Sequence, residues 1–541
     1  MHRAGPALFL NTVLGAVVKG RYHGYWRGKA MSMDSANRSR AWGGVIFSEL
    51  GILAVLGSAV FLLHMLTNGQ YGFHRDELET LDDARFPAWG YVEYPPFAPS
   101  VARLALALFG PSLVGLRLFA ALAQSIAIVL AGLMTRSLGG SRWAQAVTAL
   151  AVAIGPVSLI QGALFQYTSF DYLWWVLTAF LVIQLLETED PRWWLGIGAV
   201  VGLGMMTKYT MILLVAGIAG AMVFSQARRY LTSPWLLAGA VVSLLIFLPN
   251  LVWQIRHDFI SLEFFRSIHA RDIRLGRSDA FLLEQFVVTA NVVSVPLWLA
   301  GLYWYSFRPE GERFRPLYWM YVIPLALLLV MKGRGYYLAP AYPALIAAGV
   351  ALMETWRSSL STKRARVVQW VTVAAIAVGG ITSGALTLPI APINSPVWNL
   401  ATRVHDNCRE EIGWPILVKT VASIYATQPA LHKRHVGILT ANYGEAGAIN
   451  LIGPTYGLPT AISGVNTYWL RGYGDPPPQT LIVLGYTLHQ LDHLFETCSL
   501  VGHATSRPSV ANEESHHPNI YMCRRPRKPW PELWKDLRRF G

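Results

Sequence analysis

Two short stretches decide how this chain is interpreted: Tyr71-Gly-Phe-His-Arg-Asp-Glu-Leu78 and, soon after it, Gly90-Tyr-Val-Glu-Tyr-Pro-Pro-Phe97. They follow a long apolar segment, residues 45–67, which has the length of a helix that crosses a bilayer. Acidic and aromatic side chains therefore lie a few residues outside the edge of a membrane. The headgroup of a lipid-linked molecule would be presented at this depth.

The composition excludes an ordinary soluble protein. Of the 541 residues, 53% are hydrophobic and 14% are charged, whereas a soluble domain carries about 25% charged residues. The 20 Trp and 23 Tyr suit aromatic belts at two bilayer surfaces. The net charge of +14 raises a nucleic-acid reading, but the basic residues gather between the apolar segments and so indicate an anionic membrane surface.

The apolar segments predict an α-helical polytopic membrane protein with about eleven spanning helices, estimated from a crossing length of about 20 residues. The predicted spans are residues 45–67, 111–135, 143–162, 168–187, 193–207, 209–225, 234–254, 286–306, 317–331, 336–354 and 367–388. The division at Thr207-Lys208-Tyr209 is the least distinct, and one long or broken helix is the alternative there. A membrane domain over residues 45–389 follows.

Basic residues orient the spans, because Lys and Arg favour cytoplasmic loops. Residues 1–44 form a basic segment, which we expect in the cytoplasm and which includes Met31 and Met33 as alternative starts. Counted alternately, the internal loops carry Arg136, Arg142, Arg192, Arg228, Arg229, Arg308, Arg313, Arg315, Arg357, Lys363, Arg364 and Arg366. The loops 68–110 and 255–285 and the C-terminal region are then outside.

One outer loop breaks this rule, since it carries Arg256, Arg266, Arg271, Arg274 and Arg277. A surplus of cations on the outer side suggests that the loop holds a phosphate or an anionic acceptor. We take Arg271 as the candidate substrate-binding residue of this loop. A solvated loop facing anionic lipid is the alternative.

The character of the chain changes after Leu388. Residues 390–541 contain short strand-like runs, His435–Thr440 and Thr480–Leu484, with a helix-like stretch, Gly444–Ile452, between them. We therefore expect an extracytoplasmic α/β domain over residues 390–541. In an oxidising compartment Cys498 and Cys523 could pair and leave Cys408 free, and three unpaired thiols are the alternative.

The acids after the first span are candidates for catalysis. Transfer of a sugar to a hydroxyl needs a base that removes the acceptor proton, and a carboxylate in a partly dehydrated, aromatic-lined site can have its pKa raised enough to do this. Asp76 and Glu77 are placed for that role, and Glu93, held by the Pro-Pro turn, could orient an acceptor. Two alternatives remain: a divalent-cation site among the acids of residues 76–83, and a hydrophilic helix on the membrane surface.

A family resemblance enters with these motifs. The first loop, with its Glu-X-Pro-Pro continuation, resembles the bacterial branch of the protein-mannosyltransferase superfamily, which includes the aminoarabinose transferases of lipid A and the Rgt-type lipopolysaccharide glycosyltransferases. The similarity continues through Asp171-Tyr-Leu-Trp-Trp175, Gly204-Met-Met-Thr-Lys-Tyr209 and Gly333-Arg-Gly-Tyr-Tyr-Leu-Ala-Pro-Ala-Tyr-Pro343. The motif Asn442-Tyr-Gly-Glu-Ala-Gly447 also resembles this branch and is interpreted as a turn that opens a helix, with Glu445 in its first turn.

The resemblance implies the GT-C fold and an inverting transfer of a hexose or pentose from a polyprenyl-phosphate carrier. Asp76 would be the general base, with Glu77 and Glu93 supporting it. Tyr94 stands where the aminoarabinose transferases have Lys and the protein mannosyltransferases have His, so neither donor nor acceptor specificity carries over. The implied substrates are a polyprenyl-phosphate sugar and a lipid, glycan or other acceptor, and no nucleic acid is involved.

A lipid phosphate as leaving group requires cations near the outer headgroup plane. The topology places Arg75, Lys208, Lys332 and Arg334 there, and Tyr336 and Tyr337 offer phosphate and prenyl contacts. The alternative for each cation is an anchor at a helix end. Asp171 is a functional or helix-pairing acid, and His74 could hydrogen-bond the site.

Two rival classes are weighed against this enzyme. A transporter would carry ionisable residues at mid-depth in several spans, and a noncatalytic scaffold would leave the Asp76–Glu93 loop unexplained. We expect a multi-pass protein of the inner, cytoplasmic membrane with its active site on the extracytoplasmic face. The expectation for cofactors is none, with a divalent cation kept as the alternative.

Overall fold

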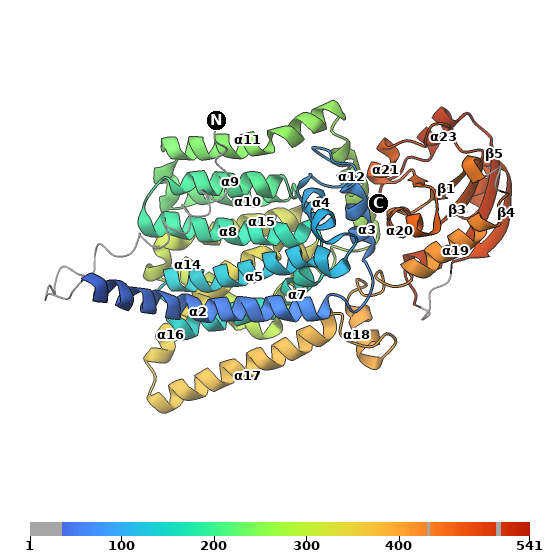
Figure 1. The fold of residues 1–541 in the computed structure, drawn as a ribbon. Coiled ribbons are helices and arrows are strands. Elements are labelled where there is room, and N and C mark those ends of the chain that lie inside the picture. The colour runs from blue at the N-terminus through green and yellow to red at the C-terminus, as the bar shows by residue number, and fades with distance from the viewer. Residues whose placement is uncertain (1–34, 430–432, 505–509) are drawn as a thin grey trace.

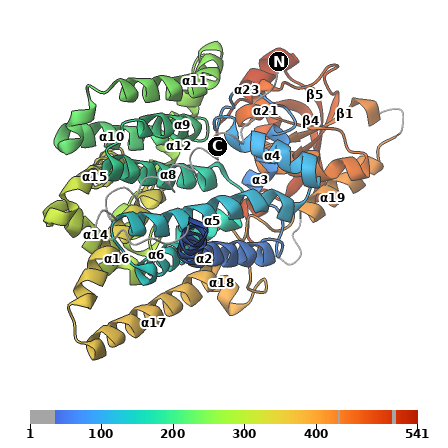
Figure 2. The same ribbon diagram turned by 60° about the vertical axis from the view of Figure 1, so that its left-hand side comes forward.

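The computed structural model describes residues 35–429, 433–504 and 510–541, so the first 34 residues of the predicted basic segment lie outside the described residues. The axes of a large helix bundle are roughly aligned, and a smaller sheet domain covers one end of the bundle (Figures 1 and 2). The bundle begins with α2, whose backbone is helical from Ser35, upstream of the predicted span.

The helices of the bundle coincide with the predicted spans. They are α2 (Ser35–Thr67), α5 (Leu113–Ser137), α6 (Arg142–Ala153), α7 (Pro156–Ala163), α8 (Tyr167–Thr188), α9 (Trp193–Met205), α10 (Met211–Phe224), α11 (Pro234–Arg256), α13 (Phe281–Val287), α14 (Val295–Phe307), α15 (Arg315–Val330), α16 (Tyr342–Ser358) and α17 (Thr362–Thr387). Short 3₁₀ turns join or follow them: η1 (Gln226–Tyr230), η2 (Val292–Ser294), η3 (Pro309–Phe314) and η4 (Gly335–Ala341).

Within the described residues, seven helices are long and apolar enough to cross a membrane, or up to nine if each bent pair is one span. The bent pairs are α6 with α7, at 69°, and α13 with the helix over 292–307, at 85°. The two other predicted spans, 193–207 and 209–225, are the shorter apolar helices α9 and α10. The multi-pass architecture is therefore confirmed, while the number eleven stays a prediction.

The turn at Lys208 separates two antiparallel helices. Met206, at the end of α9, accepts a hydrogen bond from the backbone of Phe97 in the outer loop. At the other end, Arg229 lies past the end of α10 and pairs at 3.2 Å with Glu189, which precedes α9. Since the far ends of both helices meet, α9 and α10 form a hairpin rather than one broken helix.

The loops predicted to be internal meet at one end of the bundle. Arg313 pairs at 3.2 Å with Glu189, and Glu354 accepts a hydrogen bond at 2.8 Å from the backbone of Ser141. The opposite end carries the outer helices α3 (Arg75–Asp83), α4 (Phe97–Phe109), α12 (Ile260–Arg274) and α18 (Pro396–Val404), together with the sheet domain (Figure 1). The predicted alternation of loops is thus consistent with the fold.

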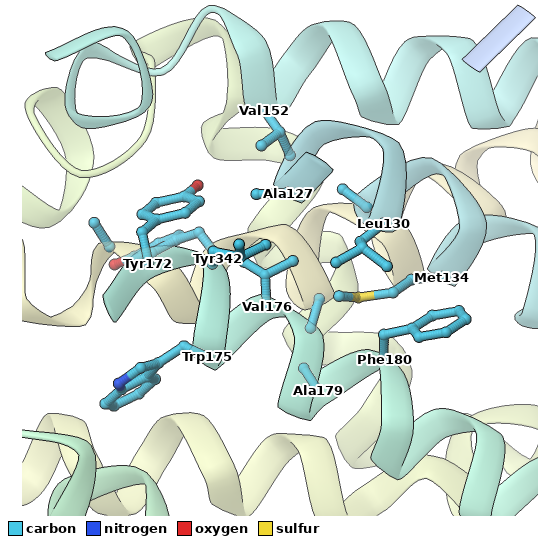
Figure 3. Close-up of a cluster of buried hydrophobic side chains, with 14 of the residues drawn as sticks. Ala127, Leu130, Met134, Val152, Tyr172, Trp175, Val176, Ala179, Phe180 and Tyr342 are labelled. Atoms are coloured by element: carbon cyan, nitrogen blue, oxygen red, sulfur yellow. The ribbon is translucent and has the colours of Figure 1, made fainter. Parts of the chain in front are cut away.

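The core of the bundle lies around α8. The apolar window of α8 is 89% buried, whereas those of α11 and α17 are only 11% and 17% buried and offer their faces to lipid. Figure 3 shows the packing of α8 against its neighbours, with Val176 and Phe180 on the side of Leu130 and Met134 and with Trp175 pointing to the other side. A helix that is apolar all round is stable either among other helices, as α8 is, or against lipid, as α11 and α17 are.

The C-terminal region is an α/β domain, as predicted. Its five-stranded sheet has the order β2-β1-β3-β5-β4, with β1 parallel to both β2 and β3, and β5 antiparallel to β3 and β4. The strands are β1 (Val436–Thr440), β2 (Ala461–Ser463), β3 (Thr480–Leu484), β4 (Phe495–His503) and β5 (Asn519–Pro526). The helices are α19 (Trp414–Ala426), α20 (Tyr443–Ile452), α21 (Asn466–Leu470), α22 (Leu488–Asp492) and α23 (Trp530–Asp536), with turns η5 (Lys433–His435), η6 (Gly453–Tyr456) and η7 (Glu513–His516).

Two further details of this domain agree with the sequence. Cys498 and Cys523 face each other on β4 and β5 and form a disulfide, while Cys408 is buried and free. Asn442 caps α20 by accepting from the backbone of Gly444, and Glu445 closes the capping box. The prediction of a helix opened by the Asn442 motif is therefore confirmed.

A buried ion pair connects the bundle, the outer loop and the C-terminal region. Arg117, in the first turns of α5, is fully buried, and its guanidinium makes two hydrogen bonds of 2.8 Å to Glu77 of α3. It also donates to Glu411, between α18 and α19, at 3.1 Å. The backbone carbonyls of Asn68 and Gly72 accept from it as well. The segment after α2, the helix α3 and the segment between α18 and α19 thus converge on one cation.

We predict that Arg117→Gln lowers the stability of the folded protein by about 3–5 kcal/mol, because it leaves buried carboxylates without their partner. Thermal unfolding of the purified protein in detergent measures the loss. Arg229→Gln is the matched control, since Arg229 forms an exposed pair of the kind that contributes about 0–1 kcal/mol. Equal melting temperatures for the two variants would contradict the prediction.

Candidate active site

The helix that carries the first acids is fixed at its beginning. His74 caps α3, since its Nδ1 accepts a hydrogen bond of 3.1 Å from the backbone N–H of Asp76. The carboxylate of Glu77 accepts in return from the backbone N–H of His74 at 2.9 Å. This reciprocal capping defines where the helix starts, so that the carboxylates of Asp76 and Glu77 leave the first turn in different directions.

Asp76 is the acid of this turn that meets solvent. Its side chain is 35% exposed. Its Oδ1 accepts from the hydroxyl of Tyr443 at 3.0 Å, and its Oδ2 accepts from the amide of Gln166 at 2.9 Å. Two ordered donors thus orient the carboxylate, and lone pairs remain for a third donor, such as an acceptor hydroxyl.

The surroundings of Asp76 keep its carboxylate ionised. Burial by itself raises the pKa of Asp76, but the basic side chains nearby and the hydrogen bond from Tyr443 outweigh this effect, so the pKa lies below its ordinary value. The raised pKa expected for a carboxylate in an aromatic-lined site is therefore wrong for Asp76. Arg75 contributes at 3.7 Å from Oδ1. At neutral pH Asp76 is therefore an anion that can accept a proton.

Glu77, in contrast to Asp76, does not meet solvent. It is fully buried, and its two oxygens accept from the guanidinium of Arg117, from the backbone of Phe165 at 2.8 Å and from the backbone of His74. These donors fill the positions around a carboxylate. The geometry gives Glu77 a structural place beneath the site.

Glu93 faces the C-terminal domain, whereas Tyr94 contacts α3 and the beginning of α8. The carboxylate of Glu93 accepts from the backbone of Thr467 at 2.8 Å and from its hydroxyl at 2.5 Å. The hydroxyl of Tyr94 donates to Asp83, and both residues are buried. Glu93 thereby holds the outer loop against the domain, whereas the ring of Tyr94 lies 5.6 Å from that of Tyr167, between their centres.

The remaining acids of α3 are buried against the C-terminal domain. Arg471 pairs with Asp82 at 2.7 Å and with Asp83, and Asn450 donates to Asp82 at 2.8 Å. Burial, together with the charges of Glu93 and Asp83, raises the pKa of Glu79 well above its ordinary value. The alternative of a hydrophilic helix on the membrane surface is wrong, because α3 is covered. Among the described residues no three acids, His or Cys are grouped so as to hold a metal ion.

An aromatic cage around Lys208 forms the second half of the site. Its ammonium lies 3.9 Å from the ring centre of Tyr337 and 5.5 and 5.6 Å from those of Tyr167 and Tyr336. Asp171 balances the charge at 4.0 Å. Gln166 donates to Asp76, and the next residue, Tyr167, lies against Lys208. Because these two residues are adjacent in sequence, the two halves of the site are neighbours. The predicted residues Asp76, Asp171, Lys208, Tyr336 and Tyr337 are thereby brought together.

Two further predicted cations lie beside this cage. Arg334 makes two hydrogen bonds to Asp272 of α12, at 2.7 and 2.8 Å, and its charge acts on Asp76. Arg271, on the same helix, is half-buried, and burial together with the charge of Arg277 lowers its pKa. Lys332 is different, since it is exposed in the turn after α15. The outer Arg loop thus contributes to the rim of the site through Arg271 and Asp272.

Several site residues had no assignment from sequence. Gln166 and Tyr167 carried no signal beyond their place at the start of a span. Arg117 could have been noticed as a charge inside a predicted span, which is costly without a partner. Tyr443 lies in the motif Asn442–Gly447, to which no chemistry had been assigned. The contact with Asp76 joins residues 367 positions apart, which no local pattern reveals.

Solved structures share this architecture. A crystal structure of ArnT from Cupriavidus metallidurans, bound to undecaprenyl phosphate, matches with a TM-score of 0.56 at 16% identity, over 87% of this chain and 97% of that one. An Archaeoglobus fulgidus oligosaccharyltransferase matches with a TM-score of 0.50 at 14% identity, over 77% and 64%. The fold is therefore the GT-C fold, on a polytopic membrane protein with a C-terminal sheet domain.

Sequence comparisons find similar proteins over part of the chain. The family model described as dolichyl-phosphate-mannose-protein mannosyltransferase matches residues 93–253. The lipid A galacturonosyltransferase RgtD of Rhizobium johnstonii is 27% identical over 52% of this chain and 60% of its own length. The undecaprenyl phosphate-alpha-4-amino-4-deoxy-L-arabinose arabinosyl transferase 1 of Pseudomonas fluorescens is 27% identical over 57% of each chain. The chain thus spans less than two thirds of these relatives.

The resemblance stated from the motifs is confirmed as a similarity: this chain has the GT-C fold and is similar in sequence to glycosyltransferases of the protein-mannosyltransferase type. The solved structures are too dissimilar in sequence to establish more than the fold.

We predict that Glu79→Gln makes stability less dependent on pH. Because the folded pKa of Glu79 is raised, the stability it contributes is present below its unfolded pKa and is lost as pH rises through the folded value. The neutral amide removes this loss and keeps an acceptor for Asn466. Melting temperatures from about pH 5 to about pH 8, above the ordinary Glu pKa of about 4.3, should fall less steeply than in the wild type.

Glu496→Gln is the control, since Glu496 is half-exposed and should leave the slope of the wild type unchanged. A slope for Glu79→Gln as steep as that of the wild type would show that Glu79 does not hold a proton in the folded protein.

Proposed function

We propose that this protein transfers a sugar from a polyprenyl-phosphate-linked donor to a hydroxyl of a lipid, glycan or other acceptor. The observation that carries the proposal is the exposed carboxylate of Asp76, oriented by Tyr443 and Gln166 and connected through Tyr167 to the cage of Lys208. Two relatives support it, since one is a lipid A galacturonosyltransferase and the other uses an undecaprenyl phosphate sugar.

In the proposed reaction Asp76 is the general base. It takes the proton of the acceptor hydroxyl as that oxygen bonds to the anomeric carbon, and the bond from this carbon to the phosphate oxygen breaks. The electron pair leaves with the lipid phosphate, and the configuration at the anomeric carbon inverts. Glu77 and Glu93 support the base by holding the ends of the outer loop.

The cage of Lys208 is proposed to hold the donor phosphate. An ammonium stabilises the charge that develops on the leaving group, and Tyr336 and Tyr337 offer rings and hydroxyls to the phosphate and the first prenyl units. Arg334 and Arg271 add positive potential at the rim. These cations neutralise the phosphate without a metal ion, so a metal-independent reaction is part of the proposal.

The proposal places the site on the extracytoplasmic face of the inner membrane. The basic loops that carry Arg229 and Arg313 lie at the opposite end of the bundle from the site, as expected for the cytoplasmic side. The disulfide between Cys498 and Cys523 supports an oxidising compartment for the C-terminal domain.

Asp76→Asn should abolish sugar transfer while the protein stays folded, because the amide cannot take a proton. Purified protein in lipid is offered a panel of radiolabelled polyprenyl-phosphate sugars with candidate lipid and glycan acceptors, and product formation is measured. Asp258→Asn, at an exposed outer turn with a φ of 52° that Asn tolerates, is the control and should transfer normally. Wild-type transfer that persists in Asp76→Asn would refute the assigned base.

Lys208→Met should weaken donor binding about 10–100-fold, because it removes an ammonium whose hydrogen bond to a phosphate contributes about 1.5–3 kcal/mol. Met keeps an apolar side chain of similar length. Binding of undecaprenyl phosphate is measured by displacement of a fluorescent polyprenyl phosphate. The double variant with Asp171→Asn removes the acid left unpaired in the single variant. Lys419→Met, an exposed lysine on α19, is the control, and equal affinities for all proteins would rule out the cage as the phosphate site.

A further inference from the structure

The motif Asn442–Gly447 brings the C-terminal domain into direct contact with the helix of Asp76. A Cβ added to Gly447 would lie 2.7 Å from the backbone of Leu78, and one added to Gly444 would lie 2.8 Å from the side chain of Arg75. Such distances are shorter than any ordinary contact, so only glycine permits α20 to approach α3 this closely. The two glycines of the motif are therefore explained by helix packing.

The close packing of α20 on α3 places Tyr443, a residue of this motif, in hydrogen-bonding contact with Asp76. It is the first residue of α20, directly after the Asn442 cap, so its position is set by the same hydrogen bonds that start the helix. Its hydroxyl donates to Oδ1 of Asp76 at 3.0 Å, and its ring lies 5.7 Å below the guanidinium of Arg75. Glu445, by capping, and Gly444, by packing, both serve this placement.

The two oxygens of Asp76 are held from two separate parts of the fold. Gln166 of the bundle holds Oδ2, and Tyr443 of the C-terminal domain holds Oδ1. Burial and the charge of Asp76 raise the pKa of Tyr443 well above its ordinary value, so its hydroxyl keeps its proton and remains a donor. A donor to a carboxylate favours the ionised form and lowers its affinity for a proton.

We infer that Tyr443 is a positioning residue for the base Asp76, and that the C-terminal domain thereby completes the catalytic site of the membrane domain. The inference rests on the proposed function, and it extends that function by assigning a part in the reaction to the C-terminal domain. Tyr443 does not exchange a proton with the substrate. It fixes the carboxylate so that its free lone pairs face the acceptor, and it sets the pH at which Asp76 becomes protonated.

The test is Tyr443→Phe, which retains the ring against Arg75 and removes only the hydroxyl. In the full-length protein in lipid, transfer should fall about ten-fold, the effect of losing one hydrogen bond to a charged group. The acidic limb of the pH profile of kcat/KM should move to higher pH, because Asp76 then takes up a proton more readily. Tyr456→Phe, on an exposed tyrosine of η6 in the same domain, should keep the wild-type rate and profile.

A loss of rate in Tyr443→Phe without any movement of the acidic limb would overturn the inference, because a merely structural defect lowers the rate at every pH. A wild-type rate would overturn it as well. Asp76→Asn is assayed beside it: if that variant is inactive and Tyr443→Phe has a wild-type profile, the proposed function stands and the inference fails.

A second measurement does not depend on sugar transfer. A water-soluble carbodiimide modifies protonated carboxyls, and Asp76 is exposed enough to react. Mass spectrometry of the peptide that contains Asp76 should show modification persisting to higher pH in Tyr443→Phe than in the wild type and Tyr456→Phe. If no donor is turned over but this shift is found, the proposed function fails while the positioning of Asp76 holds; identical labelling curves refute the positioning itself.

Discussion

The buried guanidinium of Arg117 is the interaction on which the outer half of the molecule depends. A full charge without solvent is tolerated only when carboxylates and carbonyls surround it, and Glu77, Glu411 and two backbone carbonyls do so. Because Glu77 lies in the first turn of α3, this requirement determines how that helix is rotated. Asp76 then faces the open side, while Glu79, Asp82 and Asp83 face the C-terminal domain.

Because of this rotation, the acids of one segment differ in burial and in hydrogen bonding. The acids that meet Arg117, Arg471 or Thr467 are buried and hydrogen-bonded, and they stabilise the junction of the two domains. Asp76 keeps lone pairs free and a third of its side chain exposed. Burial and satisfaction of hydrogen bonds, rather than residue type, separate a reactive carboxylate from its neighbours.

The junction also explains why the bundle and the sheet domain act together. The glycines of α20 allow its close approach to α3, and Asp82 and Asp83 of α3 meet Arg471 only when the domain is in place. The cage of Lys208 needs no such cover, because α8, the α9–α10 turn and η4 supply all of its rings and its acid. A site assembled in this way has its phosphate half within the bundle and its base at the junction.

The sequence by itself determined the membrane class, the positions of the spanning segments, the alternation of basic loops and the α/β character of residues 390–541. These features follow from local periodicity and composition, and capping at Asn442 is local as well. The acids of residues 76–93 could be named as candidates, but their division could not be predicted. Only the tertiary structure decided it, because the partners that bury Glu77 and Glu93 and orient Asp76 are Arg117, Thr467 and Tyr443, up to 374 residues away, and pairing over such distances leaves no pattern in a single chain.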